Sequence, residues 1–172
     1  MKIKSESQIR HPRSTVYTAY RDRLPEVVPY IPDIKEIRVE SREQTDHGVR
    51  LHNLWIADRE IPRMVKSFLK PEMLRWNDYA EWSDEKMVCD WTLQIPAFPD
   101  NVVCSGRNSF YADGEHTRVV LTGDLQINPK FPGIPRLVAS RLAPQIEKFI
   151  VMLITPNLER VNQSLGDFLD AQ

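Results

Sequence analysis

Several features that would assign the protein to a specialised class are missing from the sequence. It has only two cysteines, Cys89 and Cys104, which excludes a disulfide framework, and their spacing does not suit a metal site. No apolar run reaches the length of about 18 residues that a membrane helix needs, and residues 1–12 lack the apolar core of a signal peptide. The four histidines show no metal-ligand spacing, so neither a metal nor another cofactor is expected.

An excess of charge of one sign is also missing. The formal net charge is −1, which gives no general attraction for nucleic acid or for an acidic membrane. Hydrophobic residues make up 41% of the chain and charged residues 27%, which is ordinary for a globular protein. We therefore expect a soluble cytoplasmic protein in which residues 1–172 form one domain with a sizeable core.

The strongest periodic pattern lies near the end of the chain. Its apolar residues recur at steps of three and four, which places them on one face of a helix. They are Leu142, Ile146, Phe149, Ile150, Leu153, Ile154, Leu158, Val161, Leu165, Phe168 and Leu169. Pro144 suits a first helical turn, so we expect the helix to begin near it. Pro156 lies within the pattern and removes one backbone hydrogen bond, which predicts a kink.

Upstream of this helix, alternation of apolar and polar residues predicts seven strands, most of them separated by turn signals such as Asp46-His47-Gly48 and Asp113-Gly114. The expected strands cover residues 3–9, 34–45, 49–57, 73–82, 87–95, 102–110 and 119–127. Between the first two, Ser14 is the expected N-cap of a short helix, and closely spaced prolines leave room for one more short helix or turn.

The segment 61–69 (IPRMVKSFL) breaks the strand rhythm. Ile61, Met64, Val65 and Phe68 fall on one helical face, and Pro62 suits a first turn, so we expect a short amphipathic helix. A strand stays open as an alternative, because the same residues also alternate. The order of elements indicates an α+β fold whose antiparallel sheet has one apolar face. The closing helix covers only part of that face, and a curved sheet wrapped round it would leave a cavity between them.

This order resembles the helix-grip fold of the START-like (SRPBCC) superfamily over nearly the whole chain. The opening stretch QIRHPRSTVYTAYRDRLPEVVPYIPDIKEIRVESRE is similar to that superfamily's first strand, paired helices and second strand. A narrower likeness to PRELI-type phospholipid-transfer proteins lies in HPRSTVYTAY, LWIADREIPRMVKSFL and IEKFIVMLITPN. The coenzyme Q-binding and polyketide-cyclase branches are similar in fold and opening motif.

The resemblance implies a hydrophobic pocket between a curved seven-stranded sheet and the closing helix, for a lipid, a quinone or another apolar molecule. It also implies a short lid helix after the third strand, where Lys66 matches the lysine of the lid pattern. Met64, Lys66 and Phe68 are therefore the expected gate, which would open at a membrane surface. The plain alternative is a surface helix packed by its apolar residues.

Large side chains on the inner face are the expected walls of this pocket. They are Trp55, Trp76, Trp91, Phe110, Leu121, Leu125, Phe149, Ile150 and Leu153. Such side chains could equally fill an ordinary core, where aromatic residues stabilise a sheet by the area that they bury. Gly106 and Gly123 on the same face indicate either strand bends or space for a ligand.

Three polar residues, Asn53, Asp78 and Asn108, are also assigned to the inner face. A buried carboxylate is costly, so Asp78 is expected to be paired with an amide or an arginine such as Arg107, to lie near the mouth, or to be protonated. A raised pKa would make it a candidate general acid or base. A strand assignment wrong by one residue would turn all three outward.

The sequence thus predicts a carrier or sensor of a hydrophobic small molecule, most simply a lipid, with Asp78 and Asn108 among its ligand-binding residues. The alternative is a cyclase- or dehydratase-like enzyme that uses the same cavity and would need a polar cluster deep inside. A third interpretation is an interaction module with a filled cavity far below about 300 Å³.

Overall fold

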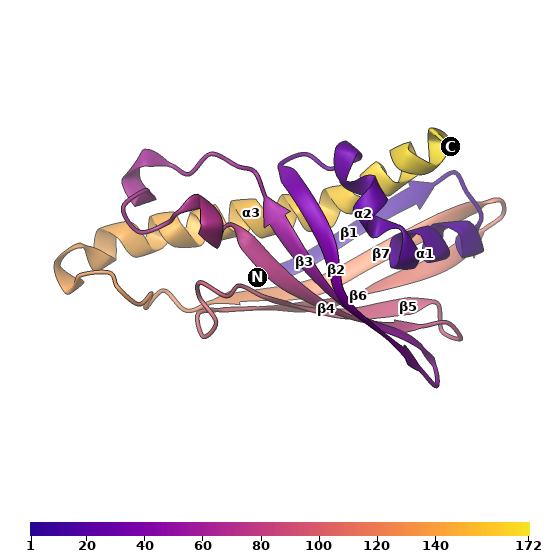
Figure 1. Cartoon of the computed structure of the whole chain (residues 1–172), viewed down its shortest axis with the longest axis horizontal. Helices are drawn as coiled ribbons and strands as arrows, with labels where there is room; N and C mark the ends of the chain where they lie inside the picture. The colour runs from indigo at the N-terminus through magenta and orange to yellow at the C-terminus, as the bar shows by residue number, and fades with distance from the viewer.

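The computed structural model describes all 172 residues and contains one antiparallel sheet of seven strands. The strands are β1 (Lys2–Ile9), β2 (Ile34–Thr45), β3 (Gly48–Ala57), β4 (Arg75–Ser83), β5 (Val88–Gln94), β6 (Val102–Asp113) and β7 (His116–Ile127). Their spatial order is β1-β7-β6-β5-β4-β3-β2, so the first strand pairs with the last (Figure 1). Consecutive strands from β2 to β7 are neighbours, which makes the rest of the sheet a simple meander.

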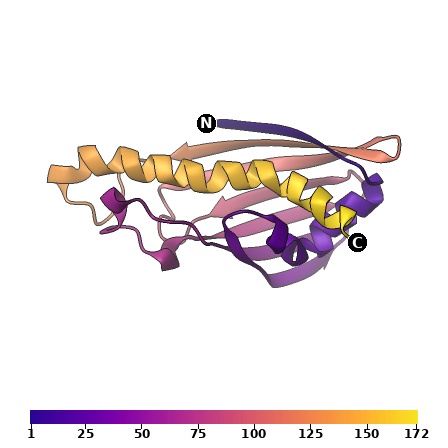
Figure 2. The ribbon, with the colours of Figure 1, turned by 90° about the horizontal axis from the view of Figure 1, so that it is seen from above.

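Helices gather on one face of this sheet. Between β1 and β2 lie α1 (Arg13–Asp22), α2 (Leu24–Val27) and the 3-10 helix η1 (Val28–Tyr30). The connection from β3 to β4 contains the 3-10 helices η2 (Arg63–Val65) and η3 (Pro71–Met73). The long helix α3 (Arg136–Asp170) runs the length of the sheet (Figure 2). The expected α+β helix-grip architecture is therefore confirmed.

The long helix begins earlier than the sequence suggested. It starts at Arg136, with Pro135 at the N-cap position, so Pro144 lies inside it rather than in its first turn. The residues that precede Pro144 favour helix strongly enough to outweigh one lost hydrogen bond. The helix also continues through Pro156 to Asp170.

Two smaller predictions near helix ends were inaccurate. Ser14 does not cap α1, which begins at Arg13 with Pro12 at the N-cap position and no side-chain cap. The helical part of segment 61–69 is only the three-residue η2, and the strand alternative was wrong. This segment buries Ile61, Val65 and Leu69, which recur at steps of four, and leaves Met64 exposed and Phe68 half-buried.

The inner face of the sheet follows the alternation of the sequence. In β5, for example, Cys89, Trp91 and Leu93 are buried while the residues between them are exposed. The two inner-face glycines make room for a tryptophan: a Cβ at Gly123 would lie 2.9 Å from Cη2 of Trp91. Gly106 faces Gly123 directly across β6 and β7, so the missing side chains are space for that indole and not for a ligand.

One end of the molecule is held by a cluster of aromatic rings under α1. Tyr17 lies edge-on to both Trp82 and Phe110, with ring centroids 5.2 and 5.3 Å apart, and Tyr20 is edge-on to Phe110 at 5.8 Å. Edge-to-face pairs of this kind stabilise a core beyond the area that they bury. Because the rings come from α1, β4 and β6, they fix the short helix on the sheet.

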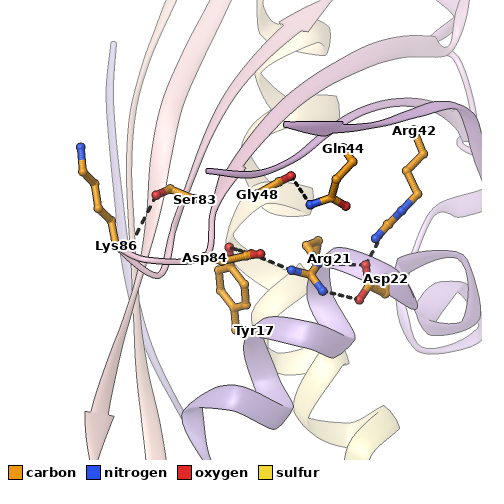
Figure 3. A network of polar contacts seen from close by, with 9 residues as sticks. All are labelled: Tyr17, Arg21, Asp22, Arg42, Gln44, Gly48, Ser83, Asp84 and Lys86. Atoms are coloured by element: carbon orange, nitrogen blue, oxygen red, sulfur yellow. Dashed lines mark hydrogen bonds and ion pairs between the residues drawn. The ribbon is translucent and has the colours of Figure 1, made fainter. Parts of the chain in front are cut away.

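A polar network covers the same place from outside (Figure 3). The Tyr17 hydroxyl and the Arg21 guanidinium both donate to Oδ1 of Asp84, at 2.9 and 2.6 Å. Arg21 also binds both oxygens of Asp22, whose Oδ1 accepts from Arg42 at 2.8 Å. The hydrogen bond from Arg21, with a smaller contribution from that of Arg42, holds the pKa of Asp22 below its ordinary value. We call α1, its ring cluster and this network the clamped end.

Candidate functional site

A cavity of about 40 Å³ lies between the inner face of the sheet and the second half of α3. It is lined by Tyr20, Leu24, Leu51, Asn53, Trp55, Trp76, Asp78, Ala80, Trp82, Cys89, Trp91, Leu93, Asn108, Ile154, Asn157, Leu158 and Val161. This volume admits a few water molecules and is far below the roughly 300 Å³ of a typical ligand pocket. The cavity is therefore closed against a large ligand in this conformation.

All four tryptophans of the chain line this cavity. Trp55 and Trp76 stack with their ring centroids 5.7 Å apart and their planes 18° from parallel. They are directly opposite each other in β3 and β4, so the sheet register brings the two indoles together. The walls are accordingly flat and aromatic, which suits planar apolar ligands.

Asp78 introduces a carboxylate into these apolar surroundings. Its Oδ2 accepts from Nδ2 of Asn53 at 3.1 Å and from Nε1 of Trp55 at 3.4 Å, while Oδ1 has no protein partner. Burial raises the pKa of Asp78 to about 6, and the hydrogen bonds from Asn53 and Trp55 and the nearby His52 limit the rise. The side chain can therefore exchange a proton near neutral pH.

The register of β3 and β4 explains how Asn53 and Asp78 come together. Asn53 faces Asp78 directly across β3 and β4, and both point inward as the alternation predicted. The suggestion that Arg107 pairs with Asp78 was wrong: Arg107 binds the exposed Asp90 with two hydrogen bonds of 2.6 and 2.8 Å. Arg107 and Asp90 are each next in sequence to an inward-facing residue, so both side chains lie on the outer face, where the two residues are paired across β5 and β6.

A second polar group lies in the same cavity. Oδ1 of Asn108 accepts from Nε1 of Trp91 at 3.1 Å, and its Nδ2 donates to the Tyr20 hydroxyl at 3.2 Å. Burial raises the pKa of Tyr20 far above its ordinary value, so this hydroxyl keeps its proton. Together with Asp78 these groups form a polar cluster inside an aromatic cavity, which can orient a ligand by hydrogen bonds.

The α3 wall of the cavity is built around Pro156. Proline has no N–H, so the carbonyl of Met152 one turn earlier loses its helical partner. Nη1 of Arg59, from the loop after β3, donates to that carbonyl at 2.8 Å and lies 3.6 Å from Oδ2 of Asp33. This arginine joins the loop to the helix at a carbonyl that has lost its helical partner.

The predicted site residues divide into three groups. Trp55, Trp76, Asp78, Trp91 and Asn108 line the cavity. The buried side chains that pack outside its lining are Phe110, Leu121, Leu125, Phe149, Ile150 and Leu153. The expected gate lies around η2, where Met64 and Lys66 are exposed and Phe68 is half-buried.

Sequence reasoning missed several contributors to the site, among them Tyr20, Arg59 and Asn157. Arg59 was not singled out, although a proline within a helix signals a free carbonyl that needs a donor. Asn157 was missed as well: it lines the cavity, and its Nδ2 donates to the carbonyl of Leu153 at 2.7 Å. No cluster of His, Cys, Asp and Glu is arranged to hold a metal ion. None of the helices is apolar enough over a sufficient length to cross a membrane.

Comparison with known proteins shows the same fold in several solved structures. The Thermus thermophilus protein TTHA0849 is 24% identical, with a TM-score of 0.71, and the match covers 99% of this chain and 98% of that one. The Zhui aromatase/cyclase from Streptomyces is 17% identical with a TM-score of 0.65, covering 98% and 93%. Norcoclaurine synthase from Thalictrum flavum, in complex with dopamine and hydroxybenzaldehyde, is 12% identical with a TM-score of 0.59, covering 100% and 87%.

These likenesses show the helix-grip fold and nothing more, since the identities are all below 25%. No family model and no curated protein matches the sequence.

Proposed function

We propose that the protein binds a hydrophobic small molecule in the cavity between the sheet and α3, with Asp78 as its polar anchor. The observation that carries this proposal is the carboxylate of Asp78, a buried residue whose Oδ1 has no protein partner, in a cavity walled by four tryptophans. A ligand that enters the cavity and donates a hydrogen bond can pair with this oxygen.

The small volume of the cavity indicates how such a ligand would be admitted. A molecule larger than a few waters requires α3 to move away from the sheet, and Pro156 lies beside the wall residues Ile154 and Asn157. The missing hydrogen bond makes it easier for the helix to bend here. The hydrogen bond from Arg59 holds the closed position.

The polar cluster also limits the class of ligand. A lipid acyl chain, such as that of the phospholipid that the PRELI-type likeness would imply, donates no hydrogen bond to Oδ1 of Asp78, which has no protein partner. A compact aromatic or polyketone molecule with hydroxyl groups can donate this hydrogen bond and stack on the indoles. Two neighbours of the same fold carry names of this chemistry, an aromatase/cyclase and a synthase in complex with dopamine and hydroxybenzaldehyde.

Tryptophan fluorescence offers a direct test, because every tryptophan lines the cavity. We expect N-phenyl-1-naphthylamine, a planar apolar probe with one N–H donor, to quench this fluorescence with saturation. Asp78→Leu should weaken its binding at least tenfold. The matched control is Asp90→Asn, on the outer face of the next strand, which should bind as wild type does. Absence of saturable quenching, together with no ligand in native mass spectra of freshly purified protein, would remove the proposal.

The pH dependence of stability provides a second test of the anchor. The pKa of Asp78 is about 6 in the folded protein against an ordinary 3.8, so the folded state binds the proton more tightly. Folding stability should therefore fall as the pH rises from about 4 to about 6, by roughly 3 kcal/mol at most. Asp78→Asn should remove this loss and unfold at higher urea concentration than wild type at pH 7, while binding the probe less well. A wild-type stability that is flat over this range would contradict the assignment.

Acid–base chemistry in the same cavity is a second candidate function, favoured by the pKa of Asp78 of about 6. An ionised Asp78 could take a proton from the carbon between two carbonyl groups, and the nearby Asn108 and Tyr20 groups could bind the resulting enolate. Deuterium exchange into 1-phenylbutane-1,3-dione, followed by NMR, tests this step. The exchange rate should rise with pH through an inflection near 6 and should be lost in Asp78→Asn but not in Asp90→Asn.

A further inference from the structure

The near-zero net charge of the chain conceals a strong local imbalance. Residues 61–71 and 128–146 each contain three basic residues and no acidic residue, so together they carry +6 while the rest of the chain carries −7. The six basic residues are Arg63, Lys66, Lys70, Lys130, Arg136 and Arg141. All six are exposed, and none takes part in an ion pair, although Glu60 and Glu72 flank the first stretch in sequence.

The two stretches lie at the same end of the molecule. The first contains η2, which packs against α3, and the second leads into α3 and forms its first turns. Both views show the start of α3 and the connection from β3 to β4 side by side, at the end opposite α1 (Figures 1 and 2). We call residues 61–71 and 128–146 the basic end.

Exposed apolar side chains belong to the same stretches. Leu137, in the first turn of α3, is 96% exposed and is the most exposed large apolar residue of the chain. Met64 in η2 is 49% exposed, and Val138 is 37% exposed. Isolated apolar residues on a surface are common, but here they are combined with six unpaired cations.

We propose that the basic end docks on the surface of an anionic lipid bilayer. Basic side chains are attracted to the negative surface of such a bilayer, and neighbouring apolar side chains enter the boundary between headgroups and acyl chains. An acidic protein partner would use the cations but would leave Leu137 unexplained. The membrane therefore fits both features, and this inference does not depend on the ligand of the cavity.

Vesicle flotation with the full chain tests the proposal. We expect binding to vesicles of phosphatidylcholine mixed with phosphatidylserine, loss of that binding as salt rises, and no binding to phosphatidylcholine alone. The double variant Arg136→Glu, Arg141→Glu and the single variant Leu137→Asp should each weaken binding at least tenfold. The controls, outside the basic end, are Arg10→Glu and Tyr111→Asp, both at exposed positions, which should bind as wild type does.

Each other outcome would overturn the proposal. Absence of binding at low salt, or equal binding by Leu137→Asp and wild type, would contradict docking at this end. If size-exclusion chromatography shows that Leu137→Asp converts a dimer into a monomer, the surface contacts a second copy of the chain instead. Quenching by N-phenyl-1-naphthylamine is measured without vesicles, so its presence or absence separates failure of this proposal from failure of ligand binding in the cavity.

Discussion

The clamped end and the basic end of the molecule are stabilised in opposite ways. At the clamped end, α1 is fixed by four packed rings and by a hydrogen-bonded network that reaches β2 and the turn after β4. At the basic end, η2 buries only Val65, and the first turns of α3 carry a fully exposed leucine. The difference predicts that local opening is easier at the basic end than at the clamped end.

The largest effect should come from removing a ring at the clamped end. Phe110 is 2% exposed and touches both tyrosines of α1, so Phe110→Ala should lower the free energy of unfolding by about 3–5 kcal/mol. Leu137→Ala, at the basic end, should change it by less than about 0.5 kcal/mol. Urea unfolding of both variants measures the contrast, and equal losses would show that the two ends are equally packed.

A smaller effect is expected where the loop after β3 holds α3. Arg59→Ala removes the donor to the Met152 carbonyl, which water can partly replace, so the loss should be about 1 kcal/mol. Amide exchange in residues 157–161 should rise more than exchange in β5, and the naphthylamine probe should associate faster. Arg63→Ala is the control, because its exposed guanidinium makes no ion pair. Unchanged exchange in residues 157–161 would mean that Arg59 does not hold the helix.

The smallest effect should come from the ionic part of the clamped end. Asp84→Ala removes the shared acceptor of Tyr17 and Arg21, but the carboxylate is 46% exposed. Exposed ion pairs contribute little, so the free energy of unfolding should fall by less than about 1 kcal/mol, and by less still at high salt. A loss as large as that of Phe110→Ala would show that charges rather than rings hold α1.

The architecture could be predicted because its signals are local. Strict alternation in β4 to β6 set the inner face correctly, including the costly inward position of Asp78. The 3.6-residue pattern likewise identified the core-facing residues of α3. Prolines were the weak point of the prediction, since α3 begins at Arg136 and contains Pro144, which was expected in its first turn.

The site could be predicted only in part, because it depends on packing between distant elements. Phe149 and Leu153 share a helix face with Ile154 and Asn157, yet only the latter two reach the cavity. The rotation of α3 against the sheet decides this, and no local pattern reports it. The volume of the cavity likewise depends on how Trp91 packs against Gly106 and Gly123. This packing depends on the register of neighbouring strands, which the sequence of a single strand does not contain.

The pairing of β1 with β7 has a consequence for how the chain acquires its fold. Lys2 aligns with Asp124, so the first strand made during synthesis has no partner until most of the chain has followed. Such long-range pairing slows folding and leaves a free backbone edge in the meantime. Lys2, Lys4 and Glu6 place charges along the unpaired β1, and these charges disfavour association between nascent chains.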